Sequence, residues 1–281
     1  MKDMWTQFRK MPAWGQVVVG GLTVLREVLR RLPAESTIYL GDNARTPYGP
    51  RSDEEVRQFS AECLDELAAR DVKAIVVACN TSSAVALPTL RLRYDVPLLG
   101  VVRPGASAAA LSTRNRRVGV IATQATVRSR AYFQAIKEED PFIEVLEQAT
   151  PDLVPLVEAG RLEGGLVEDV VRASVSPLLE AGNDIDTLLL GCTHYPLLGP
   201  VIRRVVGPQM AVIDSASATA SALAGLLEIH GLQAPSDAQA RHVQLTTGDV
   251  GKFTAIADIL FDSFFAHVEP VAVAGVVRTS P

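Results

Sequence analysis

Two cysteines each stand where an apolar run ends and small polar residues begin. Cys79 lies in "DVKAIVVACNTSSAVALP" (71–88) and Cys192 in "DIDTLLLGCTHYPLLGP" (184–200). Both stretches read as an acid, an apolar strand, a cysteine and the opening of a helix. A thiol at the carboxyl end of a strand, just before a helix, is well placed to ionise and to meet a ligand.

Polar side chains follow each of the two cysteines and could bind the same ligand. Asn80 and Thr81 come after the first, and Thr193 and His194 after the second. His194 could also exchange a proton with Cys192. One cysteine at a strand end is more often a packed side chain than a catalytic one. Two cysteines at equivalent places in a repeated pattern make a catalytic pair about as favoured as two packed side chains.

Three further segments are candidates for the same site. The loop "GDNARTPYGPRS" (41–52) is either a simple turn or a ligand-binding loop, since proline and glycine suit both. "TQAT" (123–126) follows another apolar run in the same way. Glu158, in "VPLVEAG" (154–160), is either an acid that supports a catalytic group or an ordinary helix carboxylate.

The elements that would position these residues alternate along the chain. Continuously apolar strands that alternate with amphipathic helices predict an α/β fold with parallel sheets covered on both faces. Ser52, Thr126 and Ser217 are predicted to begin helices. The predicted strands are 16–19, 37–41, 74–78, 97–102, 117–122, 142–147, 186–191, 210–214, 243–247 and 269–274. The predicted helices are 21–32, 53–70, 83–93, 105–113, 126–137, 164–181, 197–206, 217–229 and 250–262.

Composition narrows the class of protein. The chain has 281 residues, 48% of them apolar and 21% charged, with a net charge of −5, as in soluble globular proteins. No basic stripe indicates nucleic-acid binding, no apolar run is long enough for a membrane span, and no signal peptide is evident, so we expect a cytoplasmic protein. Cys63, Cys79 and Cys192 have neither disulfide nor metal-site spacing, and Cys63 is expected to pack within a helix.

The repeat suggests two domains that face each other across a shared cleft. The two cysteine stretches lie about a hundred residues apart, which is a domain length. We predict a first domain of residues 1–102 and 215–281 and a second of residues 103–214.

The assembled motifs resemble those of the glutamate racemases, within the cofactor-independent aspartate/glutamate racemase superfamily. The motifs are "GGLTVL", "GDNARTPYG", "ACNTSS", "VRPGA", "TQAT", "VPLVE" and "GCTHYP", in this order. The resemblance implies two pseudo-twofold-related, Rossmann-like (flavodoxin-like) domains with the active site between them. It implies that one cysteine thiolate removes the α-proton of glutamate while the other cysteine protonates the opposite face, with no cofactor and no metal. The product, D-glutamate, would feed peptidoglycan synthesis.

Carried onto this chain, the resemblance assigns catalysis to Cys79 and Cys192. The family's substrate-binding positions fall on Pro47, Tyr48, Gly49, Asn80, Thr81, Thr126, Thr193 and His194, with Glu158 as a supporting acid. A homodimer is a possible assembly, although nothing in the sequence defines an interface.

The chain departs from the family before Gly20. The family opens its first strand with a motif of the form Phe-Asp-Ser-Gly-Val-Gly-Gly, whereas residues 15–21 read "GQVVVGG", so that Gln16 and Val17 replace the Asp and Ser. In the family, that Asp assists the first cysteine. Its loss leaves two explanations, an altered reading frame or start site in the gene, or a divergent paralogue that is weakly active or inactive. It also leaves alternative functions, namely a non-catalytic glutamate-binding or regulatory relative, or a racemase for a related amino acid such as aspartate. A thiol hydrolase or transferase is less favoured, because a second cysteine would be surplus.

Overall fold

The fold was analysed in a computed structural model, which describes residues 20–180, 182–261 and 268–273. All of its strand pairs are parallel, as the apolar strand pattern predicts. One sheet contains, in spatial order, β5 (Glu144–Ala149), β4 (Arg117–Ala122), β6 (Thr187–Gly191) and β7 (Ala211–Asp214). A second contains β1 (Thr37–Gly41), β8 (His242–Thr246) and β9 (Val268–Pro270), and a third contains β2 (Ile75–Val77) and β3 (Leu98–Gly100).

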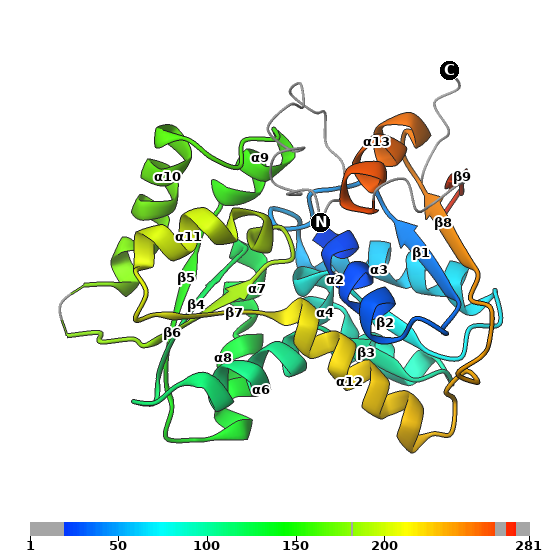
Figure 1. The fold of residues 1–281 in the computed structure, drawn as a ribbon, viewed down its shortest axis with the longest axis horizontal. Coiled ribbons are helices and arrows are strands. Elements are labelled where there is room, and N and C mark those ends of the chain that lie inside the picture. Colours follow the sequence, from blue (N-terminus) through cyan, green and yellow to red (C-terminus); the bar gives the residue numbers. More distant parts are fainter. Residues whose placement is uncertain (1–19, 181, 262–267, 274–281) are drawn as a thin grey trace.

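Helices cover the strands and connect them (Figure 1). In one half, α6 and α8 lie on one side of β4–β7, and α10 and α11 lie on the other. In the other half, α2 and α12 pack side by side beside β1–β3. The α-helices are α2 (Gly20–Arg31), α3 (Asp53–Ala68), α4 (Asn80–Val85), α5 (Leu87–Leu90), α6 (Val102–Ser112), α7 (Gln124–Ser129), α8 (Ala131–Glu139), α9 (Leu153–Glu158), α10 (Gly165–Val175), α11 (Gly199–Val206), α12 (Ser215–Ile229) and α13 (Val250–Phe261). Short 3₁₀ turns are η1 (Arg91–Arg93), η2 (Ser176–Leu178) and η3 (Tyr195–Leu198).

The sheets occupy separate stretches of the chain. The four-stranded sheet lies within residues 103–214, and the other five strands lie before or after it. The apolar core does not divide in this way. One cluster joins Leu22 of α2 to Leu188 and Val201, and another joins Leu87 of α5 to Ala106 and Val120. The two halves therefore share buried apolar contacts.

Two predicted helix starts are wrong, and one is confirmed. Ser52 caps α3 in a capping box, in which its hydroxyl accepts from the Glu55 amide while the Glu55 carboxylate accepts from the Ser52 amide. The caps of α7 and α12 are Thr123 and Asp214, each three residues earlier than predicted, because these side chains accept from the first-turn amides.

The remaining differences have local causes. The predicted helix 83–93 is divided at Ala86, two residues before Pro88, and 126–137 is divided at Arg130, whose φ is 58°. Helix α9 was not predicted, since it is short and contains Pro155. The predicted strand 16–19 lies outside the described residues.

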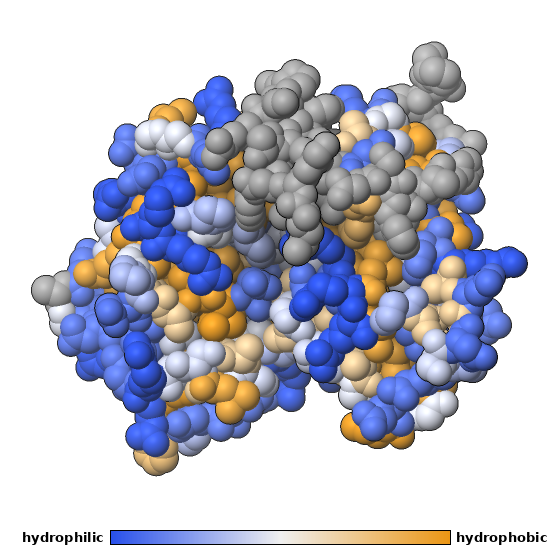
Figure 2. Space-filling view, in the orientation of Figure 1, coloured by the Kyte–Doolittle hydropathy of each residue, from blue (hydrophilic) through white to orange (hydrophobic). Residues whose placement is uncertain are grey.

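The surface mixes polar and apolar side chains, and Figure 2 shows hydrophilic residues over much of the visible face of both halves. Within the described ranges, no helix is both long and apolar enough to cross a membrane.

The capping box gives a matched stability test. Ser52 and Ser217 are both exposed, but only Ser52 caps a helix. We expect Ser52→Ala to lower the free energy of unfolding by about 1 kcal/mol, because the first turn of α3 loses a hydrogen-bond acceptor. Ser217→Ala should change it by less than about 0.5 kcal/mol. Urea denaturation of both variants measures this, and equal losses would contradict the assignment.

Candidate active site

A cavity of about 200 Å³ opens at the carboxyl ends of β1, β2 and β6. It contains all of the predicted site residues except Thr126, from both halves of the molecule. No lysine or arginine is among the described residues that line it. An anionic ligand there must be bound by backbone amides, hydroxyls, the Asn80 amide and the His194 ring. The lining site residues are Pro47, Tyr48, Gly49, Cys79, Asn80, Thr81, Cys192, Thr193 and His194.

Cys79 lies at the turn between β2 and α4, where it is the residue before the helix. Burial raises the pKa of its thiol, and hydrogen bonds from the Ser82 amide and hydroxyl oppose that rise. The nearby sulfur of Cys192 raises the pKa further, because two thiolates repel each other. Electrostatics therefore favour one thiolate and one thiol in this cavity.

Cys192 follows β6 and has a partner for its charge. Its sulfur lies 3.7 Å from Nδ1 of His194, and Nε2 of the same ring lies 3.4 Å from Oε1 of Glu158 on α9. Burial alone would lower the pKa of His194, but its contacts with Cys192 and Glu158 raise it to about 10. At neutral pH the ring is therefore protonated, and it places a positive charge between the sulfur of Cys192 and the carboxylate of Glu158.

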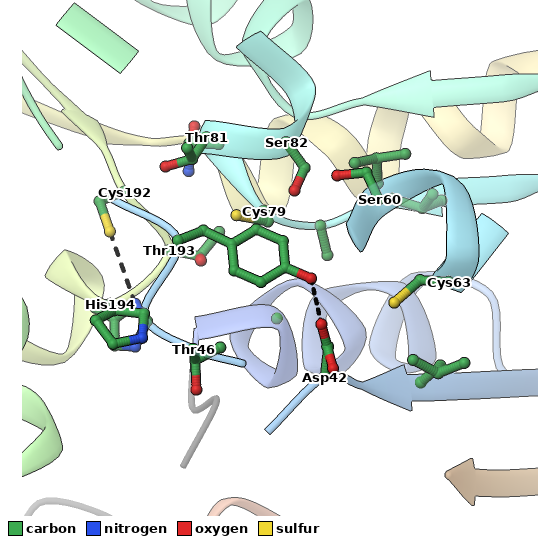
Figure 3. Close-up of a pocket in the computed structure, with 18 of the residues that line it drawn as sticks. Asp42, Thr46, Ser60, Cys63, Cys79, Thr81, Ser82, Cys192, Thr193 and His194 are labelled. Carbon is green, nitrogen blue, oxygen red and sulfur yellow. Dashed lines mark hydrogen bonds between the residues drawn. The ribbon is translucent and has the colours of Figure 1, made fainter. Parts of the chain in front are cut away.

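The two sulfurs enter the cavity from separate segments (Figure 3). Cys79 extends from the turn before α4, and Cys192 from the loop after β6, where the dashed line joins it to His194. Among the described residues that line the cavity, the one carboxylate is that of Asp42. This carboxylate is already bound by other groups, so that no carboxylate in the described lining supports Cys79 as Glu158 supports His194.

Asp42 organises the loop that carries Pro47, Tyr48 and Gly49. Its carboxylate accepts hydrogen bonds from the Tyr48 hydroxyl, from Thr247 at 2.7 Å and from Nε of Arg45 at 2.8 Å. Arg45 also pairs with Glu62 and lies 4.3 Å above the Phe59 ring. The loop is thereby bound to α3 and to the end of β8.

Cys63 lies on α3 as predicted, but it also lines the cavity. Its sulfur accepts a hydrogen bond of 3.7 Å from Arg45. Burial, followed by the charge of Asp42, raises the pKa of its thiol to about 12. It therefore stays a thiol at neutral pH and belongs to the support of the loop.

Hydroxyl and amide groups from Asn80, Thr81 and Thr123 form another part of the cavity wall. Thr81 and Thr123 are 2.9 Å apart at their Oγ1 atoms, and Thr126 is 2.9 Å from Thr123 on the side away from the cavity lining. Thr126 is fully buried, so that Thr123 takes the place in the lining that was predicted for Thr126. The Oδ1 atom of Asn80 accepts from the Tyr132 hydroxyl, whereas its buried Nδ2 has no partner among the described residues. A ligand oxygen could accept from this Nδ2.

Gly20 allows α2 to approach the second cysteine loop closely. A Cβ at this position would lie 2.3 Å from Oγ1 of Thr193 and 2.9 Å from Nδ1 of His194. Thr23, one turn later, donates to the carbonyl oxygen of Thr193 at 3.2 Å. Helix α2 therefore positions the loop that carries Cys192. Gln16 and Val17, where the family has Asp and Ser, lie outside the described residues.

Comparison with known proteins gives a consistent result. The profile of the Asp/Glu/Hydantoin racemase family matches residues 20–223. A glutamate racemase of Exiguobacterium sibiricum is 47% identical over 239 residues, which cover 85% of this chain and 88% of that protein.

Solved structures agree in fold and sequence. A glutamate racemase isoform of Bacillus anthracis superposes with a TM-score of 0.86 at 40% identity, covering 92% of this chain and 96% of that one. A glutamate racemase of Francisella tularensis, solved in complex with D-glutamate, gives a TM-score of 0.82 at 32% identity, covering 90% and 94%. The sequence motifs, the parallel α/β fold and these similarities together place this chain in the Asp/Glu/Hydantoin racemase family.

Proposed function

We propose that this protein interconverts L-glutamate and D-glutamate by proton transfer at the α-carbon, with Cys79 and Cys192 as the two acid–base groups. The observation that carries the proposal is that both sulfurs enter one cavity from different halves of the fold. A protein that only binds glutamate has no need of a second thiol. Two bases on opposite faces of a carbon can invert it without turning the substrate over.

The reaction balances between the two sulfurs. One thiolate takes the α-proton, the C–H bond breaks, and its electron pair stays on the carbon. The thiol on the other face then gives its proton to that carbon and becomes the thiolate. Each turnover therefore leaves the charge on the other sulfur, ready for the opposite enantiomer. We assign no cofactor or metal, because the two cysteine side chains supply both the base and the acid.

The surroundings suit one shared negative charge. The His194 imidazolium, held by Glu158, stabilises the thiolate of Cys192, and the Ser82 donors stabilise that of Cys79. Where the bound substrate displaces water from this cavity, these interactions become stronger in the transition state.

The substrate is bound by neutral donors and one cation. Asn80 Nδ2, the hydroxyls of Thr81 and Thr193, and the backbone around Gly49 are placed to receive the two carboxylates. Pro47 and Tyr48 shape the loop side of the cavity, and Thr126 supports Thr81 and Thr123 from behind. D-glutamate made here would serve peptidoglycan synthesis in the cytoplasm. The proposal also includes assembly as a homodimer. It further includes a division into one domain of residues 1–102 and 215–281 and a second domain of residues 103–214.

The roles of the two catalytic thiols can be tested with Cys63, the third cysteine, as a control. We expect Cys79→Ala and Cys192→Ala each to lower the rate of racemisation by at least about 10²-fold in both directions, since each direction needs a base and an acid. Cys63→Ala should stay within about tenfold of the unchanged protein. Circular dichroism of glutamate solutions follows the conversion. Retained racemisation in either of the first two variants would overturn the assignment.

The Glu158–His194 contact predicts a pH dependence. With a pKa of about 10, His194 stays charged across the neutral range and loses its proton only as the pH rises through that value. Removing the carboxylate in Glu158→Gln lowers this pKa toward its usual 6.5. The rate in the direction that uses Cys192 as base should then fall between pH 7 and 9, where the unchanged protein keeps its rate.

The same variant predicts a change in stability. A raised histidine pKa stabilises the folded state below pH 6.5, and this contribution is lost as the pH rises through about 10. Glu158→Gln should therefore lose the most stability below pH 6.5 and progressively less as the pH rises toward 10. The exposed Glu54→Gln is the control for both measurements. Identical pH profiles for the two variants would contradict a charged His194.

Gly20 provides a geometric test. Gly20→Ala places a methyl group against Thr193 and His194, so we expect the rate of racemisation to fall by roughly 10²-fold as the loop of Cys192 shifts. Gly225→Ala on α12, where nothing lies within 4 Å of the added Cβ, should leave the rate unchanged. Steady-state rates and melting temperatures of both variants separate a shifted loop from a lost fold. Equal activity in both would contradict the close approach.

A further inference from the structure

Tyr132, the second residue of α8, contacts both segments that carry the proposed acid–base groups. Its side chain is fully buried. Its hydroxyl donates a hydrogen bond to Oδ1 of Asn80, which is the residue after Cys79. Its ring lies against Gly191, the residue before Cys192, since a Cβ added at Gly191 would lie 2.9 Å from Cε2 of the ring. One side chain of the half that contains the four-stranded sheet thus lies between the two cysteine segments.

Close packing holds the Tyr132 ring in one position. On the side away from Gly191 the ring lies against Gly105 of α6. A Cβ added at Gly105 would be 3.4 Å from the Tyr132 hydroxyl oxygen and 3.5 Å from Cε1 of the ring. A tyrosine side chain turns about only two bonds, and contacts on both sides of a buried ring restrict both of them. The hydroxyl oxygen is therefore held at a fixed point beside Asn80.

The direction of the hydrogen bond between Tyr132 and Asn80 follows from the chemistry of the two groups. An amide oxygen can only accept, so the phenol supplies the proton. Burial raises the pKa of the Tyr132 hydroxyl, and a hydrogen bond with the hydroxyl of Ser215, the first residue of α12, opposes that rise. A bond that lowers the pKa of a phenol is one donated to its oxygen. Ser215 therefore donates to Tyr132, and the proton of Tyr132 is left for Asn80.

This bond decides which end of the Asn80 amide faces the ligand. Because Oδ1 and Nδ2 diverge from one carbon, binding of Oδ1 to Tyr132 leaves Nδ2 for the cavity that Asn80 lines. Nδ2 is buried and has no partner in the described part of the chain. A buried donor without an acceptor is costly, so that a ligand oxygen is favoured beside it. In the opposite orientation, Oδ1 would face the carboxylates of the substrate and repel them.

We propose that Tyr132 is a positioning residue, whose hydroxyl orients the Asn80 amide so that Nδ2 donates to a carboxylate of the bound amino acid. Tyr132 acts through Asn80 and is not among the residues that line the cavity. The identity of the ligand rests on the proposed function, whereas the orientation of the amide does not. Loss of the hydroxyl should therefore weaken substrate binding more than it slows proton transfer.

Steady-state kinetics of Tyr132→Phe test the role in binding, because this variant keeps the ring against Gly191 and removes only the hydroxyl. We expect KM to rise roughly tenfold for L-glutamate and for D-glutamate, while kcat changes by less than about threefold. Tyr94→Phe is the control, since the Tyr94 hydroxyl donates to Asp65 at 2.6 Å and does not line the cavity. It should leave both constants unchanged. An unchanged KM in Tyr132→Phe, or a fall in kcat alone, would overturn the proposal.

The Asn80→Ala background separates this role from a purely structural one. If the Tyr132 hydroxyl acts through the Asn80 amide, Tyr132→Phe should raise KM no further once the amide is absent. A similar rise in both backgrounds would show that the hydroxyl serves the fold instead, and it would overturn the proposal. Should Asn80→Ala not fold, the KM of Tyr132→Phe alone and the orientation of the amide decide the matter.

Neutron diffraction from deuterium-exchanged crystals of the unchanged, unliganded protein shows the orientation of the amide without any measurement of activity. We expect the deuteron of the Tyr132 hydroxyl to lie toward Oδ1 of Asn80, and the two deuterons of Nδ2 to lie on the cavity side. The reverse orientation of the amide would overturn the proposal, whatever the substrate is. The expected orientation in a protein that does not racemise glutamate would support the positioning role and contradict the proposed function alone.

Discussion

Repulsion between two thiolates in one small cavity is the electrostatic constraint on which the site depends. Burial and the proximity of Cys192 both raise the pKa of Cys79, so that a second negative charge is costly. One thiolate with one thiol is the combination that a two-base inversion requires. His194 and Glu158 add an asymmetry, because they support the charge on Cys192 and nothing equivalent among the described residues supports it on Cys79. Because the single thiolate charge is supported unequally on the two cysteines, the two directions of the reaction should differ in their sensitivity to pH.

Parallel sheets make this arrangement possible. Strands that run in one direction bring their carboxyl ends to one edge, where β2 delivers Cys79 and β6 delivers Cys192. Close approaches then fix the loops. Gly20 leaves room for the side chains of Thr193 and His194. A Cβ added at Gly49 would lie 3.0 Å from Cβ of Thr123 in the other half. The cavity is thus shaped from both halves by residues that have no part in proton transfer.

The sequence predicts the strands well, because short apolar runs between polar turns leave few alternatives. Helix starts are less predictable, since Thr123 and Thr126 are equally good caps and only the local backbone selects the first. For the same reason, the sequence predicts that Thr126 lines the cavity, whereas in the structure Thr123 does. The two cysteines were found through their repeated surroundings. The Asp42–Arg45–Glu62 contacts were missed, because a residue on α3 lies far from the loop in sequence and pairs with it only after folding.

The position of solvent deuterium after partial reaction tests the two-thiol claim most directly. The unchanged protein would be incubated in D₂O with L-glutamate or with D-glutamate and stopped at low conversion, and each enantiomer would be isolated and analysed by mass spectrometry. The account predicts that the newly formed enantiomer carries deuterium at the α-carbon while the remaining substrate keeps its proton, in both directions. Because one sulfur removes the proton and the other delivers a deuteron, the two pools stay distinct. Deuterium in the recovered substrate without inversion, or the original proton retained in the product, would show that a single base acts on both faces and would contradict the account.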